Sequence, residues 1–383
     1  KPKSRPNCVR SLEVIIVKKL RWIIDNSKSA NGIASPDYSL QIFSDMSQTL
    51  ARENLSSGNA KAAVENDDLD TAAKALTDET QGSLIAALED KRSGLEIVDK
   101  KESNAQDGAI ADSIFRTYDI RGIVGDTLNE QIVTEIGRAI GSEAFERGEQ
   151  RIVVGRDGRL SGPSLLEALK KGLVQSGRDV IDIGEVPTPL LYFATHYLDS
   201  SSGVVLTGSH NPKDYNGLKI VIAGHTLSGD EIKALKTRID TGNMMKGKGS
   251  QETTTVIQDY ISQVTSDVAL TQPLKVAVDC GNGVAGKVAP QLLQALGCEV
   301  IGLYCKVDGN FPNHHPDPSK PENLQELIEL VKTEKADVGL AFDGDGDRLG
   351  VVDSDGNIIW PDRQMMLYAM DVLSRNPGAD IIY

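Results

Sequence analysis

The stretch DGDGDR, at residues 343–348, places three carboxylates within five residues of the chain. In an extended segment Asp343, Asp345 and Asp347 project from one face, and the glycines between them let the backbone fold closely around an ion. Three carboxylates this close repel one another strongly and need a cation between them. Oxygen ligands favour a hard divalent ion. The pattern therefore predicts a site for one Mg²⁺ ion.

Two other interpretations of this acidic stretch are less favourable. An EF-hand loop beginning at Asp343 requires glycine at its sixth position and glutamate at its twelfth, where the chain has Arg348 and Ser354. A solvated acidic turn is the usual explanation of such a run. Here the flanking segments ADVGLAF and LGVVD are typical of buried strands, so we expect the carboxylates at a strand end within a core.

A second candidate for chemistry is Ser209, in the segment TGSHNP at residues 207–212. The short apolar strand Val204–Leu206 leads into it, and its small neighbours predict a hydroxyl exposed on a tight loop. His210 is adjacent, but neighbouring side chains of an extended chain point apart, and no GxSxG sequence surrounds the serine. A Ser–His hydrolase pair is therefore not implied. A lone Ser-His dipeptide is typical of an ordinary turn, whereas the longer string TGSHNPKDYNGLKI is far more specific.

Four segments together resemble the α-D-phosphohexomutases, and most closely the bacterial phosphomannomutase/phosphoglucomutase branch. In chain order they are FRTYDIRG (115–122), TGSHNPKDYNGLKI (207–220), GNGVAG (281–286) and DGDGDR (343–348). The resemblance covers about residues 110–383. It implies an enzyme that interconverts hexose 1-phosphate and hexose 6-phosphate, of mannose or glucose, through a 1,6-bisphosphate intermediate. Phosphoglucosamine mutases share the serine and aspartate loops and are the alternative within the family.

The resemblance also implies a cofactor arrangement. Ser209 would carry a covalent phosphate and would bind one Mg²⁺ together with Asp343, Asp345 and Asp347. Phosphoryl transfer depends mostly on positioning and on neutralising the charge of the phosphoryl oxygens. A phosphoserine beside three aspartates would be repelled unless a divalent ion bridges them.

Five further residues acquire roles only from the resemblance. Tyr118, Arg121 and Arg348 fall on positions that bind the sugar phosphate. Arg121, Lys219 and His210 surround the transferred group and are implied to be catalytic. Lys219 is the preferred proton shuttle, on the condition that burial and neighbouring cations lower its pKa, and His210 is the second candidate.

The elements around both loops alternate between strands and helices. Strands are predicted at 151–155, 179–183, 204–206, 274–279, 299–303, 338–342 and 380–383, and helices at 161–176, 189–197, 284–296, 321–335 and 363–373. This alternation predicts layered α/β domains, in which ligands bind beyond the carboxyl ends of strands. The serine and aspartate loops both follow such a strand end.

The chain is predicted to have four regions. They are a helical, partly disordered extension and linker (1–108), domain I with the phosphoserine loop (109–262), domain II with the metal loop (263–361) and the start of a third domain (362–383). The fold class is therefore α/β, with two successive layered mixed-sheet phosphohexomutase domains and the beginning of a third. Because the family has four domains, we expect the 383-residue chain alone to bind Mg²⁺ without turnover. A module that only binds Mg²⁺ or phosphate is the corresponding alternative function.

Two other segments invite hypotheses that we do not favour. Leu12–Ile24 is apolar and basic, as in a helix at a membrane surface, but a helix packed on its neighbours explains it better. Gly281, Gly283 and Gly286 meet the GxGxxG spacing of a dinucleotide-binding loop. The acid required about twenty residues later is missing, so we interpret these glycines as a tight strand-to-helix turn.

Composition narrows the partners and the compartment. A net charge of −14 argues against general nucleic-acid binding. The chain has no run of eighteen apolar residues, so no membrane-spanning helix is predicted. Cys8, Cys280, Cys298 and Cys305 form no CxxC pair and are predicted to be free thiols, buried in the case of the last three. Free thiols are typical of proteins in the reducing cytoplasm, so we expect a cytoplasmic location. We expect small hexose phosphates as substrates and a monomer or weak oligomer.

Overall fold

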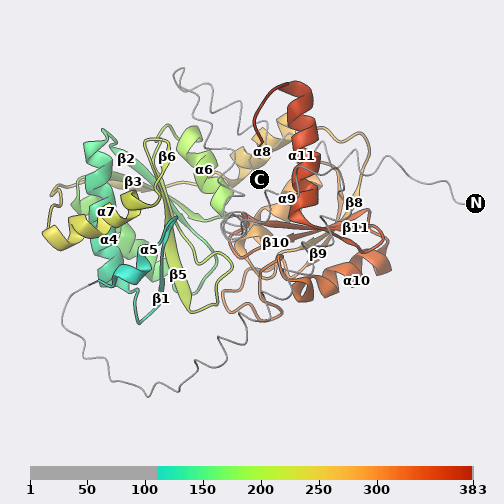
Figure 1. The fold of residues 1–383 in the computed structure, drawn as a ribbon, viewed down its shortest axis with the longest axis horizontal. Coiled ribbons are helices and arrows are strands. Elements are labelled where there is room, and N and C mark those ends of the chain that lie inside the picture. Colours follow the sequence, from blue (N-terminus) through green and yellow to red (C-terminus); the bar gives the residue numbers. More distant parts are fainter. Residues whose placement is uncertain (1–109, 382–383) are drawn as a thin grey trace, which may run out of the picture. The chain divides into compact units, whose positions relative to one another are not determined.

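The computed structural model of this chain describes residues 110–381. Within them lie two mixed β-sheets, one after the other along the chain, each with helices against both faces (Figure 1). The predicted extension at 1–108, with its candidate membrane-surface helix, lies outside the described residues, as does Cys8. The α/β fold class predicted from the alternation of elements is confirmed for the described residues.

The first sheet has the order β1-β5-β4-β2-β3-β7, with β6 paired to β5. Its strands are β1 (Ile120–Ile123), β2 (Arg151–Arg156), β3 (Asp179–Glu185), β4 (Gly203–Leu206), β5 (Tyr215–Ile222), β6 (His225–Thr226) and β7 (Gln251–Thr253). The helices are α4 (Glu130–Glu146), α5 (Gly162–Gln175), α6 (Thr188–Tyr197), α7 (Asp230–Thr241) and α8 (Ile257–Asp267), with a 3₁₀ turn at Asp112–Ile114. Strands β2, β3, β4 and β7 are parallel, whereas β5 runs antiparallel to β4 and β1.

Alternation along the strands explains why this sheet is covered on both faces. On β2, Ile152 and Val154 pack with α4, α5 and α7, while Val153 between them packs with α6 and α8. All three side chains are almost fully buried. Because successive side chains of a strand point to opposite faces, an uninterrupted apolar strand requires a helical layer on each side.

The second sheet has the order β12-β11-β10-β8-β9. Its elements are β8 (Lys275–Asp279), α9 (Ala289–Ala295), β9 (Glu299–Leu303), α10 (Gln325–Glu334), β10 (Val338–Phe342), β11 (Leu349–Asp353), β12 (Ile358–Ile359) and α11 (Pro361–Arg375). Val276 and Val278 face the cluster that includes α9, whereas Ala277 faces the cluster that includes α10. This sheet therefore repeats the three-layer arrangement of the first.

Both candidate loops occupy the same kind of place in their sheets. The serine loop joins β4, which is parallel to β2, to the antiparallel strand β5. The aspartate loop joins β10, which is parallel to β8, to the antiparallel strand β11. Each loop is thus the connection of a hairpin at the carboxyl end of a buried strand.

Two predicted helices begin differently from the expectation. The helix expected at 284–296 is interrupted, because a 3₁₀ turn at Val284–Lys287 ends at Val288, whose backbone is not helical, and α9 begins only at Ala289. Pro290 has no backbone N–H to continue the hydrogen-bond ladder, so it favours a new helix start there. The helix expected at 321–335 begins with a 3₁₀ turn at Pro321–Leu324, a common form of a helix amino terminus.

The end of the described chain also differs from the prediction. Helix α11 is longer than the predicted range 363–373, and the two described residues of the predicted strand 380–383, Asp380 and Ile381, adopt no regular structure. The predicted domain boundary at 262 falls inside α8. Because α8 contacts both α6 and α9, we propose that this helix is the junction between the two domains.

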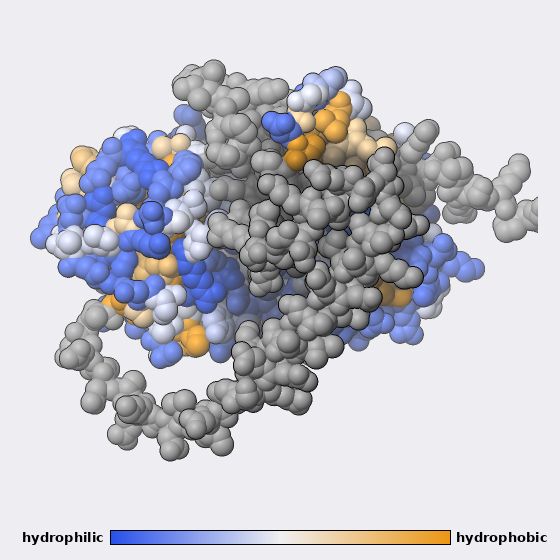
Figure 2. Space-filling model, in the orientation of Figure 1, coloured by the Kyte–Doolittle hydropathy of each residue, from blue (hydrophilic) through white to orange (hydrophobic). Residues whose placement is uncertain are grey.

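The surface over α11 is less polar than most of the visible surface (Figure 2). Its exposed apolar side chains are Trp360, Met366, Met370 and Leu373.

No helix within residues 110–381 combines the length and hydropathy needed to cross a membrane. Cys280, Cys298 and Cys305 are free thiols; the first two are buried, but Cys305 is only partly so, contrary to the prediction.

Candidate functional site

The serine loop and the aspartate loop are in direct contact. Ser209 Oγ donates a hydrogen bond to Asp343 Oδ2 at 3.1 Å. The backbones also approach closely, because a Cβ atom added to Gly344 would lie 2.4 Å from the carbonyl oxygen of Ser209. Only glycine fits at such a position. The structure thus brings together the two motifs that the sequence singled out for chemistry.

The conformation of Ser209 overturns two expectations about its side chain. Its backbone φ is 49°, in the left-handed region, so the chain is not extended there. As a result Ser209 Oγ lies 3.2 Å from His210 Nδ1, and the prediction that the adjacent side chains point apart is wrong. The predicted exposed hydroxyl is also wrong, because Ser209 is only 1% exposed.

A buried arginine holds the backbone of the serine loop. The guanidinium group of Arg159, whose side chain is fully buried, donates hydrogen bonds to carbonyl oxygens of the loop. The accepting residues are Ser209, Asn211, Pro212 and Tyr215. A Cβ atom added to Gly208 would lie 2.2 Å from Cζ of Arg159, so the loop has no space for a larger residue there.

Asp157 completes this support of the serine loop. Its carboxylate pairs with Arg159 at 3.1 Å and accepts hydrogen bonds from Thr207 Oγ1 at 2.8 Å and Gly208 N at 3.1 Å. Thr207 Oγ1 in turn accepts from the backbone N–H of Ser209. Sequence reasoning missed Asp157 and Arg159. The signal was available, since both lie within four residues of the carboxyl end of the strand predicted at 151–155.

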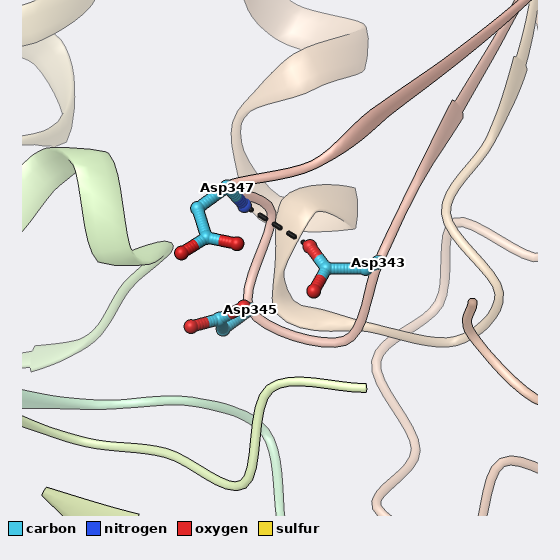
Figure 3. A group of neighbouring side chains, drawn as sticks. All are labelled: Asp343, Asp345 and Asp347. Carbon is cyan, nitrogen blue, oxygen red and sulfur yellow. Dashed lines mark hydrogen bonds between the residues drawn. The ribbon is translucent and has the colours of Figure 1, made fainter. Parts of the chain in front are cut away.

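The three aspartates converge although their segment is a hairpin turn and not extended. One carboxylate oxygen from each of Asp343, Asp345 and Asp347 lies within 4.8 Å of the others (Figure 3). Asp343 Oδ1 accepts hydrogen bonds from the backbone N–H groups of Asp347 and Arg348, both at 3.1 Å, which close the turn. The expected extended geometry is therefore wrong, but the predicted cluster forms.

Burial and mutual repulsion give the aspartates unequal proton affinities. Burial, followed by the charges of Asp345 and Asp347, raises the pKa of Asp343 well above its usual value. Burial and the charge of Asp345 also raise the pKa of Asp347. Burial alone would raise the pKa of Asp345, but Lys219 and a hydrogen bond from Thr188 outweigh it and hold this pKa below its usual range.

Lys219 reaches the aspartates from the middle of β5. Its Nζ lies 2.9 Å from Asp345 Oδ2 and 2.5 Å from Asp347 Oδ2. Burial lowers the pKa of Lys219, but the charges of the two carboxylates outweigh burial and raise it well above the usual value. We expected neighbouring cations to lower the pKa of Lys219, but its charged neighbours are anions, and they raise it.

The remaining predicted residues are His210, two arginines whose charges act on it, and Tyr118 in the segment before β1. Burial, then the charges of Arg348 and Arg121, lower the pKa of His210 to about 4, with Asp317 acting in the opposite direction. Arg121 is buried on β1 and pairs with Asp119. Tyr118 is half-buried in the segment that leads into β1. The charges of two arginines thus act on the neutral histidine that contacts Ser209.

Thr188 is a contact of the aspartate loop that sequence reasoning missed. Its Oγ1 donates a hydrogen bond to Asp345 Oδ2 at 2.7 Å. The other carboxylate oxygen, Asp345 Oδ1, is buried and has no hydrogen-bond partner. A buried oxygen without a partner is costly unless something else binds it. This oxygen and the two neighbouring carboxylates fit a cation with oxygen ligands.

The glycine-rich segment after β8 supports the backbone of the aspartate loop. Gly281 and Asn282 have φ angles of 48° and 59°, which turn the chain sharply at the strand end. The N–H of Val284 then donates to the carbonyl oxygen of Gly344 at 3.2 Å. These residues form the tight strand-to-helix turn that was expected.

The family of the chain follows from comparison with known proteins. Residues 112–245 match the family described as phosphoglucomutase/phosphomannomutase, alpha/beta/alpha domain I, and residues 258–356 match its domain II. The chain belongs to the phosphoglucomutase/phosphomannomutase family. The α-D-phosphohexomutase resemblance seen in the four motifs is thereby confirmed.

Two relatives and one crystal structure show how similar this chain is to members of the family. The chain is 60% identical over 281 residues to the phosphomannomutase/phosphoglucomutase of Pseudomonas aeruginosa PAO1, covering 73% of this chain and 61% of that protein. It is 52% identical over 277 residues to the phosphoglucomutase of Neisseria gonorrhoeae, covering 72% of this chain and 60% of that protein. A crystal structure of a phosphoglucomutase/phosphomannomutase family protein from Burkholderia thailandensis superposes with a TM-score of 0.69 at 53% identity, over 70% of this chain and 61% of that one. The chain thus spans about three fifths of the length of these relatives.

Proposed function

We propose that this chain carries the phosphoryl-transfer half of a magnesium-dependent phosphoserine mutase. The enzyme would interconvert the 1-phosphate and 6-phosphate of mannose and glucose. The observation that carries the proposal is the hydrogen bond between Ser209 Oγ and Asp343 Oδ2, which joins a nucleophile to a cluster of carboxylates in a buried junction. The names of relatives that share half or more of their aligned residues with this chain support the choice of sugars.

The carboxylate cluster would hold one Mg²⁺. Asp343, Asp345, Asp347 and Ser209 would be its protein ligands, and the unpartnered Asp345 Oδ1 supports this assignment. The ion would neutralise the carboxylates, remove much of the charge that raises the pKa of Lys219, and add positive charge beside the phosphoryl oxygens.

The reaction has two phosphoryl transfers. In the first, the bond between Ser209 Oγ and phosphorus breaks as phosphorus bonds to the free hydroxyl oxygen of a hexose monophosphate. The proton of that sugar hydroxyl passes to a base, and the leaving Ser209 Oγ takes up a proton from an acid. The resulting 1,6-bisphosphate reorients, and its other phosphoryl group returns to Ser209 Oγ, which gives up its proton, while the released sugar oxygen regains one. Arg121, Arg348 and Tyr118 would bind the sugar phosphate and balance its charge.

Lys219 and His210 are the candidates for proton transfer, and their environments give them opposite capacities. The aspartates raise the pKa of Lys219 well above its usual value, so Lys219 is protonated, and it becomes a suitable proton donor once a bound cation offsets their charge. His210 has a pKa of about 4 and contacts Ser209 Oγ, so it is neutral at pH 7 and able to accept one. Groups whose pKa values are pushed apart in this way are suited to separate acid and base roles.

Mass analysis of phosphate on the chain tests the nucleophile. After incubation with glucose 1,6-bisphosphate and Mg²⁺, the chain should gain the mass of one phosphate, which peptide mapping should place on Ser209. Ser209→Ala should gain none. Ser201 is a matched control, because it too has a left-handed backbone but is exposed and lies outside the loop, and Ser201→Ala should be labelled like the original chain. Phosphate on another residue, or none at all, would contradict the proposal.

Activity measurements decide between the sugars and between turnover and binding alone. A chain that spans the full length of the relatives should convert mannose and glucose 1-phosphates, and preference for glucosamine phosphate would support the alternative branch. Mg²⁺ binding without turnover of any of these sugar phosphates would favour a binding module over the mutase. The free thiols at Cys280, Cys298 and Cys305 support the cytoplasmic location that we propose.

A further inference from the structure

We infer that Thr188 is a positioning residue that orients the Asp345 carboxylate toward the bound cation. The inference rests on the proposed function, which provides that cation. Thr188 makes two contacts with the same residue, because its Oγ1 donates to Asp345 Oδ2 at 2.7 Å and its backbone N–H donates to the carbonyl oxygen of Asp345 at 2.9 Å. Both residues are fully buried, so water does not compete for these hydrogen bonds.

The two oxygens of the Asp345 carboxylate have different surroundings. Oδ2 accepts hydrogen bonds from Thr188 Oγ1 and from Lys219 Nζ, at 2.7 and 2.9 Å. Oδ1 is buried and has no partner. Donors that hold one oxygen of a carboxylate fix the rotation of the group and therefore the direction of the other oxygen. Ligating carboxylates are commonly oriented by such outer hydrogen bonds. Thr188 thus leaves Oδ1 available to the ion.

The place of Thr188 in the fold connects the two sheets. It is the first residue of α6, which packs against β2 and β4 of the first sheet, and β4 leads directly into the serine loop. A Cβ atom added to Gly346 would lie 3.3 Å from Cβ of Pro187, so the start of α6 lies against the aspartate loop. The helix that covers the strand before Ser209 therefore also orients a ligand on the second sheet.

Direct measurement of cation binding tests this role without relying on activity. Mn²⁺ serves as the probe, and the free ion is quantified by electron paramagnetic resonance during titration of the 383-residue chain. Thr188→Val keeps the shape of the side chain but removes the hydroxyl, and it should weaken Mn²⁺ binding about 10-fold. Thr188→Ser restores the hydroxyl and should return the affinity to within about 2-fold of the original, because the outer hydrogen bond is kept.

Thr195→Val is the matched control. Thr195 lies on the same helix, is 4% exposed, and donates its hydroxyl to the carbonyl oxygen of Tyr192 instead of to the aspartate loop. It should bind Mn²⁺ with the original affinity, and circular dichroism should show that all three variants are folded. Unchanged affinity in Thr188→Val, or equal losses in Thr188→Val and Thr195→Val, would overturn the role of Thr188. If the original chain binds no Mn²⁺, the proposed metal site fails, and this inference fails with it.

Discussion

The serine loop and the aspartate loop occupy equivalent places in two similar sheets, but their polar groups are satisfied in different ways. In the serine loop, Arg159 and Asp157 bind the backbone from several sides and neutralise each other. In the aspartate loop, Asp343 and Asp347 repel a third carboxylate, and among residues 110–381 the positive charges that oppose this repulsion are those of Lys219 and Arg348. The carbonyl and carboxylate groups of the first loop have protein partners, whereas the second loop keeps a buried carboxylate oxygen without one and fits the cation that we propose.

This difference shows which parts of the site belong to the fold and which belong to the chemistry. Both loops follow a buried parallel strand and return along an antiparallel one, so the fold provides the same frame twice. The charged residues differ: Arg159 and Asp157 hold the serine loop through protein hydrogen bonds, whereas the three aspartates form the site that we propose for a cation. The following three predictions test the comparison, from the largest expected effect to the smallest.

Removing the arginine that supports the serine loop should have the largest effect. Arg159→Met leaves the Asp157 carboxylate and the carbonyl oxygens that Arg159 binds without their donor in a buried position. Loss of one partner of a buried ion pair costs about 3–5 kcal/mol in the free energy of unfolding, which denaturant titration measures. Arg151→Met is the control, because the Arg151 side chain is 44% exposed and its pair with Glu252 is long, at 3.4 Å. The control should lose less than about 1 kcal/mol. Equal effects in both variants would mean that the serine loop has no special internal support.

A cation should stabilise the chain through the aspartate loop. With Mg²⁺ at about 100 times its Kd, the free energy of unfolding should rise by about 2.7 kcal/mol. Asp343→Asn keeps the shape of the side chain but removes one charge, so the stabilisation by Mg²⁺ should largely disappear. Without Mg²⁺, this variant should be at least as stable as the original chain at pH 8, because one buried repulsion is relieved.

Asp279 provides the control for this experiment. It is a buried carboxylate at the end of β8 that already has a protein partner, since it lies 2.9 Å from His314 Nε2. Asp279→Asn should therefore respond to Mg²⁺ as fully as the original chain does. A response lost in Asp279→Asn but kept in Asp343→Asn would place the Mg²⁺ site at Asp279 and not in the aspartate loop.

The Asp279–His314 pair should also produce a small pH dependence of stability. Burial lowers the pKa of His314, but the hydrogen bond to Asp279 and its charge outweigh burial and raise the net pKa. A histidine whose folded pKa is raised contributes stability that is fully present below its unfolded pKa, about 6.5, and is lost as pH rises through the folded pKa. We expect a loss of about 1 kcal/mol over this range, measured by denaturant titration between pH 5.5 and 8. His314→Gln should flatten this profile, and an unchanged profile would show that the pair does not hold the proton.

Local sequence patterns determined much of this molecule. Apolar runs such as those at 151–155 and 338–342 specify strands because the period of side chains along a strand is local, and the structure has strands there. The acidic and serine motifs singled out Ser209 and the three aspartates for the same reason, since residue type and spacing are readable in the sequence. The break before α9 was also readable, from Pro290, although we expected a continuous helix.

Only the tertiary structure decided which residues surround these motifs. The left-handed conformation of Ser209, which turns its hydroxyl toward His210 and Asp343, depends on a loop held by Arg159, fifty residues earlier in the chain. Lys219 reaches Asp345 from strand β5 and Thr188 reaches it from the start of helix α6, because of the order of strands in the first sheet and the position of that helix. A sequence specifies each element through neighbours a few residues apart, but burial, pKa and orientation arise from groups that the folded chain brings together. For this reason the residues with chemical potential were visible in the sequence, while their electrostatic surroundings were not.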